Sequence, residues 1–129
     1  MNSKKYILLL LSFIMVVSAF IMDIPSANAA IAIKDIVCTQ TSAYALKEDG
    51  TVWAWGVNSN GQLGNGTINN SFIPVQVKGL SGVKAICCTQ ITAYALKEDG
   101  TAWAWGANSY GQLGNGTINN SFIPVQVKV

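Results

Sequence analysis

The fold is decided by a short stretch of sequence, ALKEDGTVWAWG, at residues 45–56. Nearly the same letters, ALKEDGTAWAWG, return at residues 95–106. The Asp-Gly pair at 49–50 is typical of a tight hairpin turn. The flanking segments 43–47 and 51–55 are short and rich in aromatic or β-branched residues, as strands are. The stretch therefore predicts a β-hairpin that occurs twice.

The hairpin is part of a longer internal repeat. Shifting the chain by 50 positions aligns residues 38–79 with residues 88–129, and 36 of these 42 pairs are identical. The pairs that differ are Thr41/Ile91, Ser42/Thr92, Val52/Ala102, Val57/Ala107, Asn60/Tyr110 and Gly79/Val129. A period of about 50 residues lies in the range of propeller blades.

Further strands are expected in each unit. Residues 72–77 have strand composition, and Pro74 confines that position to an edge or a bulge. Residues 83–88 are expected to form a fourth strand. The Gly- and Asn-rich segment 58–67 excludes a helix there. We predict an all-β fold of antiparallel, four-stranded propeller blades, in two repeats at about 33–82 and 83–129, which together make an incomplete propeller.

The amino-terminal region has the pattern of a secretory signal. Lys4 and Lys5 precede an uncharged, apolar run at 6–22, and Pro25 and small residues follow at 26–30. This predicts a helical signal peptide over residues 1–29, cleaved after Ala29, and a secreted or extracellular protein. The run is long for a signal, so the alternative is an uncleaved anchor that holds the chain at the cell surface. A membrane is expected as a partner only if the segment is uncleaved.

Charge argues against nucleic acid as a partner. Residues 30–129 contain six lysines against five acidic residues, and the whole chain lacks arginine. Neither a basic stripe nor an arginine that could read base edges is present.

The sequence also offers little catalytic chemistry. Histidine is absent, so a metal centre and a nucleophile with a histidine base are not expected. The glycine run at 64–66 has Asn69 where a dinucleotide fingerprint requires glycine, and no Lys-Ser or Lys-Thr pair follows it, so a cofactor site is not expected either. Three cysteines, Cys38, Cys87 and Cys88, are an odd number, so at least one thiol is unpaired. Their apolar neighbours favour small buried side chains, with a Cys38–Cys88 disulfide as the alternative.

The tryptophans alternate with alanine. Trp53 and Trp55 are two residues apart and share one face of a strand, as Trp103 and Trp105 do. The favoured interpretation is that these indoles fill the gap between stacked blades, because aromatic side chains bury a large apolar area. The alternative is a platform for stacking sugars or binding a protein.

Together these motifs resemble a known repeat. The sequences at 45–56 and 95–106, each followed by Asn, by Gly-Gln-Leu-Gly and by Pro, are similar to the repeat of the regulator of chromosome condensation family; the matching positions are Asn58, 61–64 and Pro74, then Asn108, 111–114 and Pro124. The resemblance implies four-stranded blades, typically seven in a closed ring. Two departures are the presence of only two repeats and the lack of the histidine that usually precedes the Ala-Leu pair.

The resemblance also bears on function. The best-known family activity is nucleotide exchange on a small GTPase, whereas secreted bacterial members, among them an inhibitor of β-lactamases, agree better with a signal sequence. We expect an exported, non-catalytic binding module for a protein or a surface glycan. Its candidate rim comprises loops 58–70 and 108–120 and their neighbours: Trp53, Trp55, Asn58, Asn60, Trp103, Trp105, Asn108 and Tyr110.

Three alternatives remain open. The first is a secreted carbohydrate-active enzyme that uses Glu48 or Glu98, although the adjacent Asp-Gly turns explain these carboxylates already. The second is a guanine-nucleotide exchange factor. The third concerns assembly: stacked repeats normally need about three units, so the chain is expected to be a fragment of a longer array or a subunit that closes a ring as a homo-oligomer.

Overall fold

A computed structural model describes residues 30–129. The expected signal peptide and its helix lie outside this range and stay predictions. Within the described range, no helix is long and apolar enough to cross a membrane. Residues Ile31–Val129 form one compact unit.

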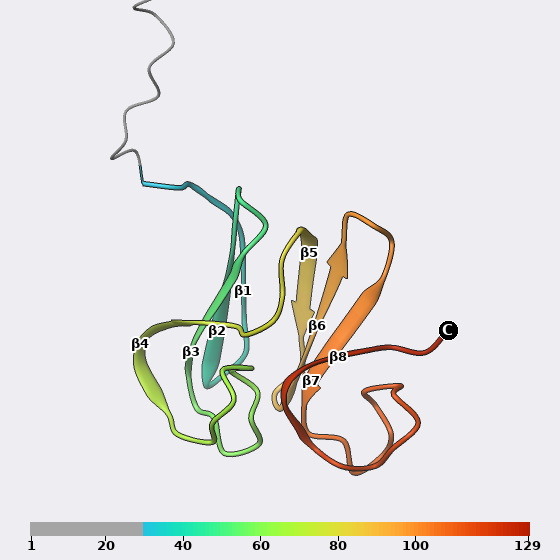
Figure 1. Ribbon diagram of the computed structural model, residues 1–129. Helices are drawn as coiled ribbons and strands as arrows, with labels where there is room; N and C mark the ends of the chain where they lie inside the picture. Colours follow the sequence, from blue (N-terminus) through green and yellow to red (C-terminus); the bar gives the residue numbers. More distant parts are fainter. Residues whose placement is uncertain (1–29) are drawn as a thin grey trace, which may run out of the picture. The chain divides into compact units, whose positions relative to one another are not determined.

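This unit consists of two antiparallel sheets of four strands each (Figure 1). The first sheet contains β1 (Ile33–Cys38), β2 (Ser42–Lys47), β3 (Val52–Gly56) and β4 (Ser71–Gln76), paired in chain order. The second contains β5 (Val83–Cys88), β6 (Thr92–Lys97), β7 (Ala102–Gly106) and β8 (Ser121–Gln126), with the same order. The predicted all-β fold of four-stranded antiparallel blades is confirmed.

The position of one predicted strand was wrong. Residues 83–88 do not complete the first sheet; they form β5 and pair with β6 in the second sheet. The fourth strand of the first sheet is β1, which lies at the sheet edge beside β2 and which the sequence pattern did not single out. The reason is that β1 already fills the place beside β2, and β5, its counterpart 50 residues later, takes the same place beside β6. The chain therefore leaves the first sheet after β4 and begins the next one (Figure 1).

The hairpin turn joins β2 to β3 as the Asp-Gly pair predicted. The amide of Gly50 donates to the carbonyl of Lys47 at 2.9 Å, and the amide of Lys47 donates to the carbonyl of Thr51 at 2.9 Å. Gly50 has a φ of 76°, a left-handed conformation that glycine adopts at no steric cost.

A second glycine is required where β3 ends. Gly56 has a φ of 109°, and a Cβ atom there would lie 2.2 Å from the backbone oxygen of Thr41. No side chain fits at that distance, so β2 and β3 come together this closely only with glycine.

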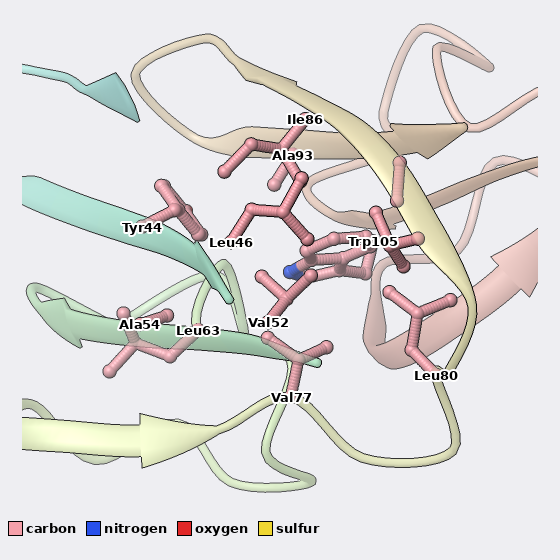
Figure 2. Packing of buried hydrophobic residues seen from close by; sticks show 12 residues of the cluster. Tyr44, Leu46, Val52, Ala54, Leu63, Val77, Leu80, Ile86, Ala93 and Trp105 are labelled. Carbon is pink, nitrogen blue, oxygen red and sulfur yellow. The ribbon is translucent and has the colours of Figure 1, made fainter. Parts of the chain in front are cut away.

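The hydrophobic core lies between the two sheets (Figure 2). The first sheet and its loops contribute Tyr44, Leu46, Val52, Ala54, Leu63 and Val77; the second sheet and the connection contribute Leu80, Val83, Ile86, Ala93, Ala95 and Trp105. Figure 2 shows Trp105 among Leu46, Val52 and Leu80. Each blade thus buries one apolar face against the other blade, as expected for stacked repeats.

The cysteines are less buried than the sequence predicted. All three are free; Cys38 and Cys87 are exposed and Cys88 is half-buried. The buried-hydrophobe interpretation was therefore wrong for Cys38 and Cys87. Cys38 stands opposite Ala43 on the outer face of the first sheet, and Cys87 stands opposite Tyr94 on the outer face of the second. Apolar sequence neighbours do not reveal which face of a strand is covered.

Candidate binding surfaces

Each rim loop is built around one buried asparagine. Asn58 accepts a hydrogen bond from the amide of Leu63 at 2.9 Å and donates to the carbonyls of Thr67 and Asn69 at 2.9 and 3.0 Å. Asn108 makes the corresponding contacts in the second loop. Both asparagines are fully buried. They were predicted as contact residues of the rim, and the structure corrects this: they hold the loops in shape and do not reach a partner.

In each rim loop, a glutamine side chain holds the backbone of the one residue that differs between the two loops. The side-chain oxygen of Gln62 accepts the amide of Asn60, and that of Gln112 accepts the amide of Tyr110, both at 2.9 Å. Loops 58–70 and 108–120 differ only at this position. Asn60 is half-buried, whereas the side chain of Tyr110 is 94% exposed. A firmly held backbone therefore presents an unpacked aromatic ring to solvent.

The four tryptophans have two different environments. Trp105 is fully buried and meets Tyr44 of the first sheet edge to face, with ring centroids 6.5 Å apart. Trp103 is half-buried and packs against the same core. The gap-filling interpretation is confirmed for these two residues. Trp105 is consequently unavailable as a rim contact, contrary to its place in the predicted set.

Trp53 and Trp55 lie on the outer face of the first sheet. They line an apolar hollow of about 310 Å³ together with Ile33, Ile36, Ala45, Lys47 and Pro74. The structure thus does not bring the predicted site residues into one surface. Asn60 and Tyr110 belong to the loops, whereas Trp53 and Trp55 belong to an open sheet face.

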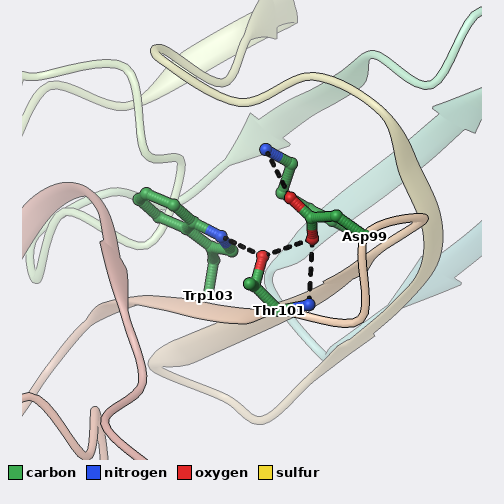
Figure 3. Close-up of polar contacts among 4 residues, drawn as sticks. Asp99, Thr101 and Trp103 are labelled. Atoms are coloured by element: carbon green, nitrogen blue, oxygen red, sulfur yellow. Dashed lines mark hydrogen bonds and ion pairs between the residues drawn. The ribbon is translucent and has the colours of Figure 1, made fainter.

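Polar contacts at the hairpin hold Trp103 in the second sheet (Figure 3) and Trp53 in the first. In the second sheet, the indole of Trp103 donates to Thr101 Oγ1 at 3.0 Å, and that hydroxyl donates to Asp99 at 2.6 Å. Lys97 lies 3.7 Å from the other carboxylate oxygen of Asp99, with its ammonium 5.6 Å from the Trp103 ring centroid. The first sheet repeats the chain of contacts from Trp53 through Thr51 to Asp49.

These contacts give the aspartates a structural role. Hydrogen bonds from the Thr101 side chain and then its amide lower the pKa of Asp99, and those from Thr51 lower the pKa of Asp49. A carboxylate held ionised in a turn is poorly suited to donate a proton. Among residues 30–129, no group of three or more His, Cys, Asp or Glu side chains could hold a metal ion.

Sequence reasoning missed the contact of Phe122 with the first loop. The amide of Gly66 donates to the carbonyl of Phe122 at 2.8 Å, and a Cβ atom on Gly61 would lie 2.3 Å from the Phe122 ring. The equivalent Phe72 is 98% exposed, against 42% for Phe122. The signal in the sequence was the repetition of Phe and Gly at the same positions, but it does not state that they meet across blades.

Comparison with known families accounts for this architecture. The family model described as "Regulator of chromosome condensation (RCC1) repeat" matches residues 49–93 and 99–129, and a second model of the same description matches residues 33–62 and 83–112. The chain belongs to the regulator of chromosome condensation repeat family. The resemblance predicted from the sequence is thereby confirmed.

Relatives within the RCC1-repeat family are longer proteins. The ultraviolet-B receptor UVR8 of Arabidopsis thaliana is 38% identical over 53 residues, which are 41% of this chain and 12% of that protein. The human regulator of chromosome condensation is 38% identical over 48 residues, 37% of this chain and 11% of that protein. The chain thus spans about an eighth of the length of these relatives.

Solved structures share the fold. Human WBSCR16 superposes with a TM-score of 0.66 at 24% identity, covering 74% of this chain and 26% of that one. Yeast RCC1 (Prp20), solved with Kap60, gives 0.68 at 24% identity, covering 78% and 24%. Prp20p from Saccharomyces cerevisiae, described with its binding to Gsp1p and histones, gives 0.70 at 16% identity, covering 82% and 27%. At these identities the likeness shows the blade fold alone.

Proposed function

We propose that this chain is an exported, non-catalytic module that binds a protein through its second rim loop. The observation that carries the proposal is Tyr110, an exposed ring on a loop whose backbone is fixed by Gln112 and Asn108. Tyrosine is enriched among the residues that dominate binding energy at protein interfaces. A rigid loop also loses little conformational entropy when it binds.

The family supports protein binding in particular. Yeast RCC1 is named in complex with Kap60, and Prp20p is described as binding Gsp1p and histones. RCC1-repeat proteins are mostly binding or regulatory proteins rather than enzymes. Guanine-nucleotide exchange is the alternative by family analogy, but an amino terminus with the pattern of a secretory signal favours an extracellular protein partner.

Binding is tested with the full chain on a panel of purified extracellular proteins and cell-surface glycans. The decisive variant is Tyr110→Asn, which gives the second loop the sequence of the first and so preserves its fold. We expect it to weaken binding to the protein identified by about 30-fold, equivalent to a hot-spot loss of about 2 kcal/mol. Asn60→Tyr, the reverse change in the first loop, is the matched control and leaves the affinity at least as high.

Unchanged affinity of Tyr110→Asn would overturn the rim assignment. Retention of glycans without retention of proteins would favour the platform of Trp53 and Trp55, and turnover of a glycan would revive the enzyme hypothesis. Export is tested separately by sequencing the amino terminus of the chain released into the medium. The proposal expects it to begin at Ala30, and an intact Met1 on membrane-bound chain contradicts cleavage.

A further inference from the structure

The two sheets meet through opposite faces. We define the tryptophan face of a sheet as the side that carries its two tryptophans, and the tyrosine face as the side that carries Tyr44 or Tyr94. The tryptophan face of the second sheet packs on the tyrosine face of the first, since Trp105 lies against Tyr44. The tryptophan face of the first sheet and the tyrosine face of the second therefore have no neighbour within residues 30–129.

The open tryptophan face is a copy of a buried one. Ile36, Ala45 and Trp53 stand in one row across β1, β2 and β3, and Ile86, Ala95 and Trp103 form the same row in the second sheet. Ile36 is 60% exposed, whereas Ile86 is 9% exposed. Pro74 is exposed and Pro124 is buried. Ile36 and Pro74 are thus uncovered where Ile86 and Pro124 are covered, whereas Ala45 and Ala95 are buried in both sheets.

The open tyrosine face is likewise a copy of a buried one. Leu96 is 38% exposed where Leu46 is completely buried, and Tyr94 is half-buried where Tyr44 is buried. This face has its own apolar hollow, of about 210 Å³, lined by residues that include Tyr94, Leu96 and Ala102. A surface that matches the tryptophan face is available on the same chain.

Polar groups on the open faces also correspond to bonded groups inside. Across the internal contact, the Trp105 indole donates to the carbonyl of Gln62 at 2.9 Å. The carbonyl of Gln112 accepts only Tyr94 among residues 30–129, at 3.1 Å, and the described part of the chain holds no acceptor for the Trp55 indole. A donor and an acceptor that would complete the same bond thus stand on the two open faces.

The contact between Phe122 and Gly61 also has an equivalent pair of residues that are not in contact. Inside the chain, the ring of Phe122 lies over Gly61. The corresponding Phe72 is almost fully exposed, and a Cβ on Gly111 would meet nothing within 4 Å in the described structure. Within residues 30–129, Phe72 and the surface over Gly111 therefore both lack the contact that Phe122 and Gly61 make.

We propose that copies of this chain associate head to tail, with the tryptophan face of one first sheet docked on the tyrosine face of another copy's second sheet. Trp55 then donates to the carbonyl of Gln112 in the next copy, and Phe72 covers Gly111 there. Such a contact joins two different surfaces, so repetition closes a ring or extends a chain. Continuity with the internal contact, whose residues are repeated almost identically, identifies a second copy as the occupant.

Two differences make this contact weaker than the internal one. Gln90 donates to the Thr41 hydroxyl across the sheets at 3.1 Å, but the equivalent residue on the second sheet is Ile91, whose side chain has no acceptor. Ala102 replaces Val52 and leaves part of the receiving surface unfilled. Association should therefore depend on concentration, unlike the packing of the two sheets within one chain.

The test is sedimentation velocity of the full chain between 1 and 100 μM with two variants that each place a lysine on one face. Ile36→Lys blocks the tryptophan face, and Leu96→Lys blocks the tyrosine face. We expect the unmodified chain to gain mass with concentration and each variant to remain a single copy. An equimolar mixture of the two is expected to form dimers only, because each variant keeps one intact face of opposite kind.

Controls separate this result from other causes. Glu98→Lys also introduces a lysine, with a larger change of charge than either blocking variant, at a hairpin tip. Its counterpart Glu48 stays exposed despite the internal contact, so association should persist. Phe72→Ala changes a solvent-exposed ring, cannot unfold the sheet by opening a cavity, and should weaken association at least tenfold. All variants share residues 1–29, so a contribution of that segment would be equal in each.

Several outcomes would overturn the proposal. They are a single-copy mass for the unmodified chain at every concentration, equal association of Ile36→Lys, or a mixture of variants that stays monomeric. Association of Leu96→Lys alongside monomeric Ile36→Lys would indicate a symmetric contact between tryptophan faces, which also contradicts it. Tyr110→Asn should leave association intact because Asn60 occupies that position at the internal contact, so failure of rim binding and failure of self-association are distinguishable.

Discussion

The indole of Trp105 donates a 2.9 Å hydrogen bond to the backbone carbonyl of Gln62, which belongs to the loop of the preceding blade. The hydroxyl of Tyr44 donates to the same oxygen at 2.8 Å. One carbonyl therefore joins a strand of its own blade to a strand of the next. Both donors are buried, so these bonds form away from competing water.

The first prediction is that tryptophans at equivalent positions of the two sheets contribute unequally to the free energy of unfolding. Trp105→Ala should lower the free energy of unfolding by about 3–5 kcal/mol, because it removes a large buried side chain and leaves a cavity between the sheets. Trp55→Ala, at the same position of the first sheet, should cost far less. Urea unfolding followed by circular dichroism measures both, in a Leu96→Lys background so that no second copy covers Trp55.

Equal losses for the two variants would contradict the arrangement, since they would mean that the faces of both sheets are equally buried. Trp105→Phe serves as an intermediate case. It keeps most of the apolar contact and removes the donor to Gln62, and it should cost less than Trp105→Ala.

The sequence predicted what is local and missed what depends on neighbours. The Asp-Gly turn, the alternation of Trp and Ala, and the 50-residue period each describe a single blade, and the structure agrees with them. Whether Trp55 or Trp105 is covered depends on which sheet lies beside it, and the two share almost identical sequence surroundings. The exposed thiols of Cys38 and Cys87 were misjudged for the same reason.

The second prediction concerns the asparagine inside the first rim loop. Asn58→Ala leaves the amide of Leu63 and the carbonyls of Thr67 and Asn69 without their partner. Unsatisfied buried groups cost about 1–3 kcal/mol each, although water that enters the space recovers part of this, so a loss of at least about 2 kcal/mol is expected. Hydrogen exchange should also show faster exchange of the Leu63 amide.

Asn60→Ala is the matched control for that loop. Its side-chain amide makes only a 3.5 Å contact with Ser59, so its loss should change stability by less than about 0.5 kcal/mol. A larger effect from Asn60 than from Asn58 would show that the loop is not organised around the buried side chain.

The third prediction concerns acid stability. Hydrogen bonds from Thr101 hold the pKa of Asp99 below 3.8, its ordinary value. The folded chain therefore binds fewer protons at this site than the unfolded chain, so the stabilisation is present above pH 3.8 and is lost as the pH falls through the folded pKa. Thr101→Val should raise the pKa of Asp99 toward 3.8, as measured by carboxyl NMR titration.

Thr51→Val provides the same test for Asp49 in the first blade. Thr101→Ser keeps the hydroxyl and should keep the low pKa of Asp99, which separates the hydrogen bond from the loss of a methyl group. An unchanged Asp99 pKa in Thr101→Val would assign the shift to the amide of residue 101, which the variant retains, and to the charge of Lys97, since both also lower it.

The last prediction concerns alkaline stability and returns to the shared carbonyl. Burial raises the pKa of Tyr44 well above 10.0, with a further contribution from charge on Cys88. The folded state therefore favours the protonated phenol, so its stabilisation is complete below pH 10.0 and is lost as the pH rises toward the folded pKa. Tyr44→Phe should cost only about 1 kcal/mol at pH 7, because Gln62 keeps the bond from Trp105. Its loss of stability above pH 10 should be smaller than that of the unmodified chain in pH-dependent urea unfolding. Tyr94→Phe, at the equivalent but less buried position, should change the alkaline profile less, and a larger change from Tyr94 would contradict the assignment of Tyr44 to the protected interior between the blades.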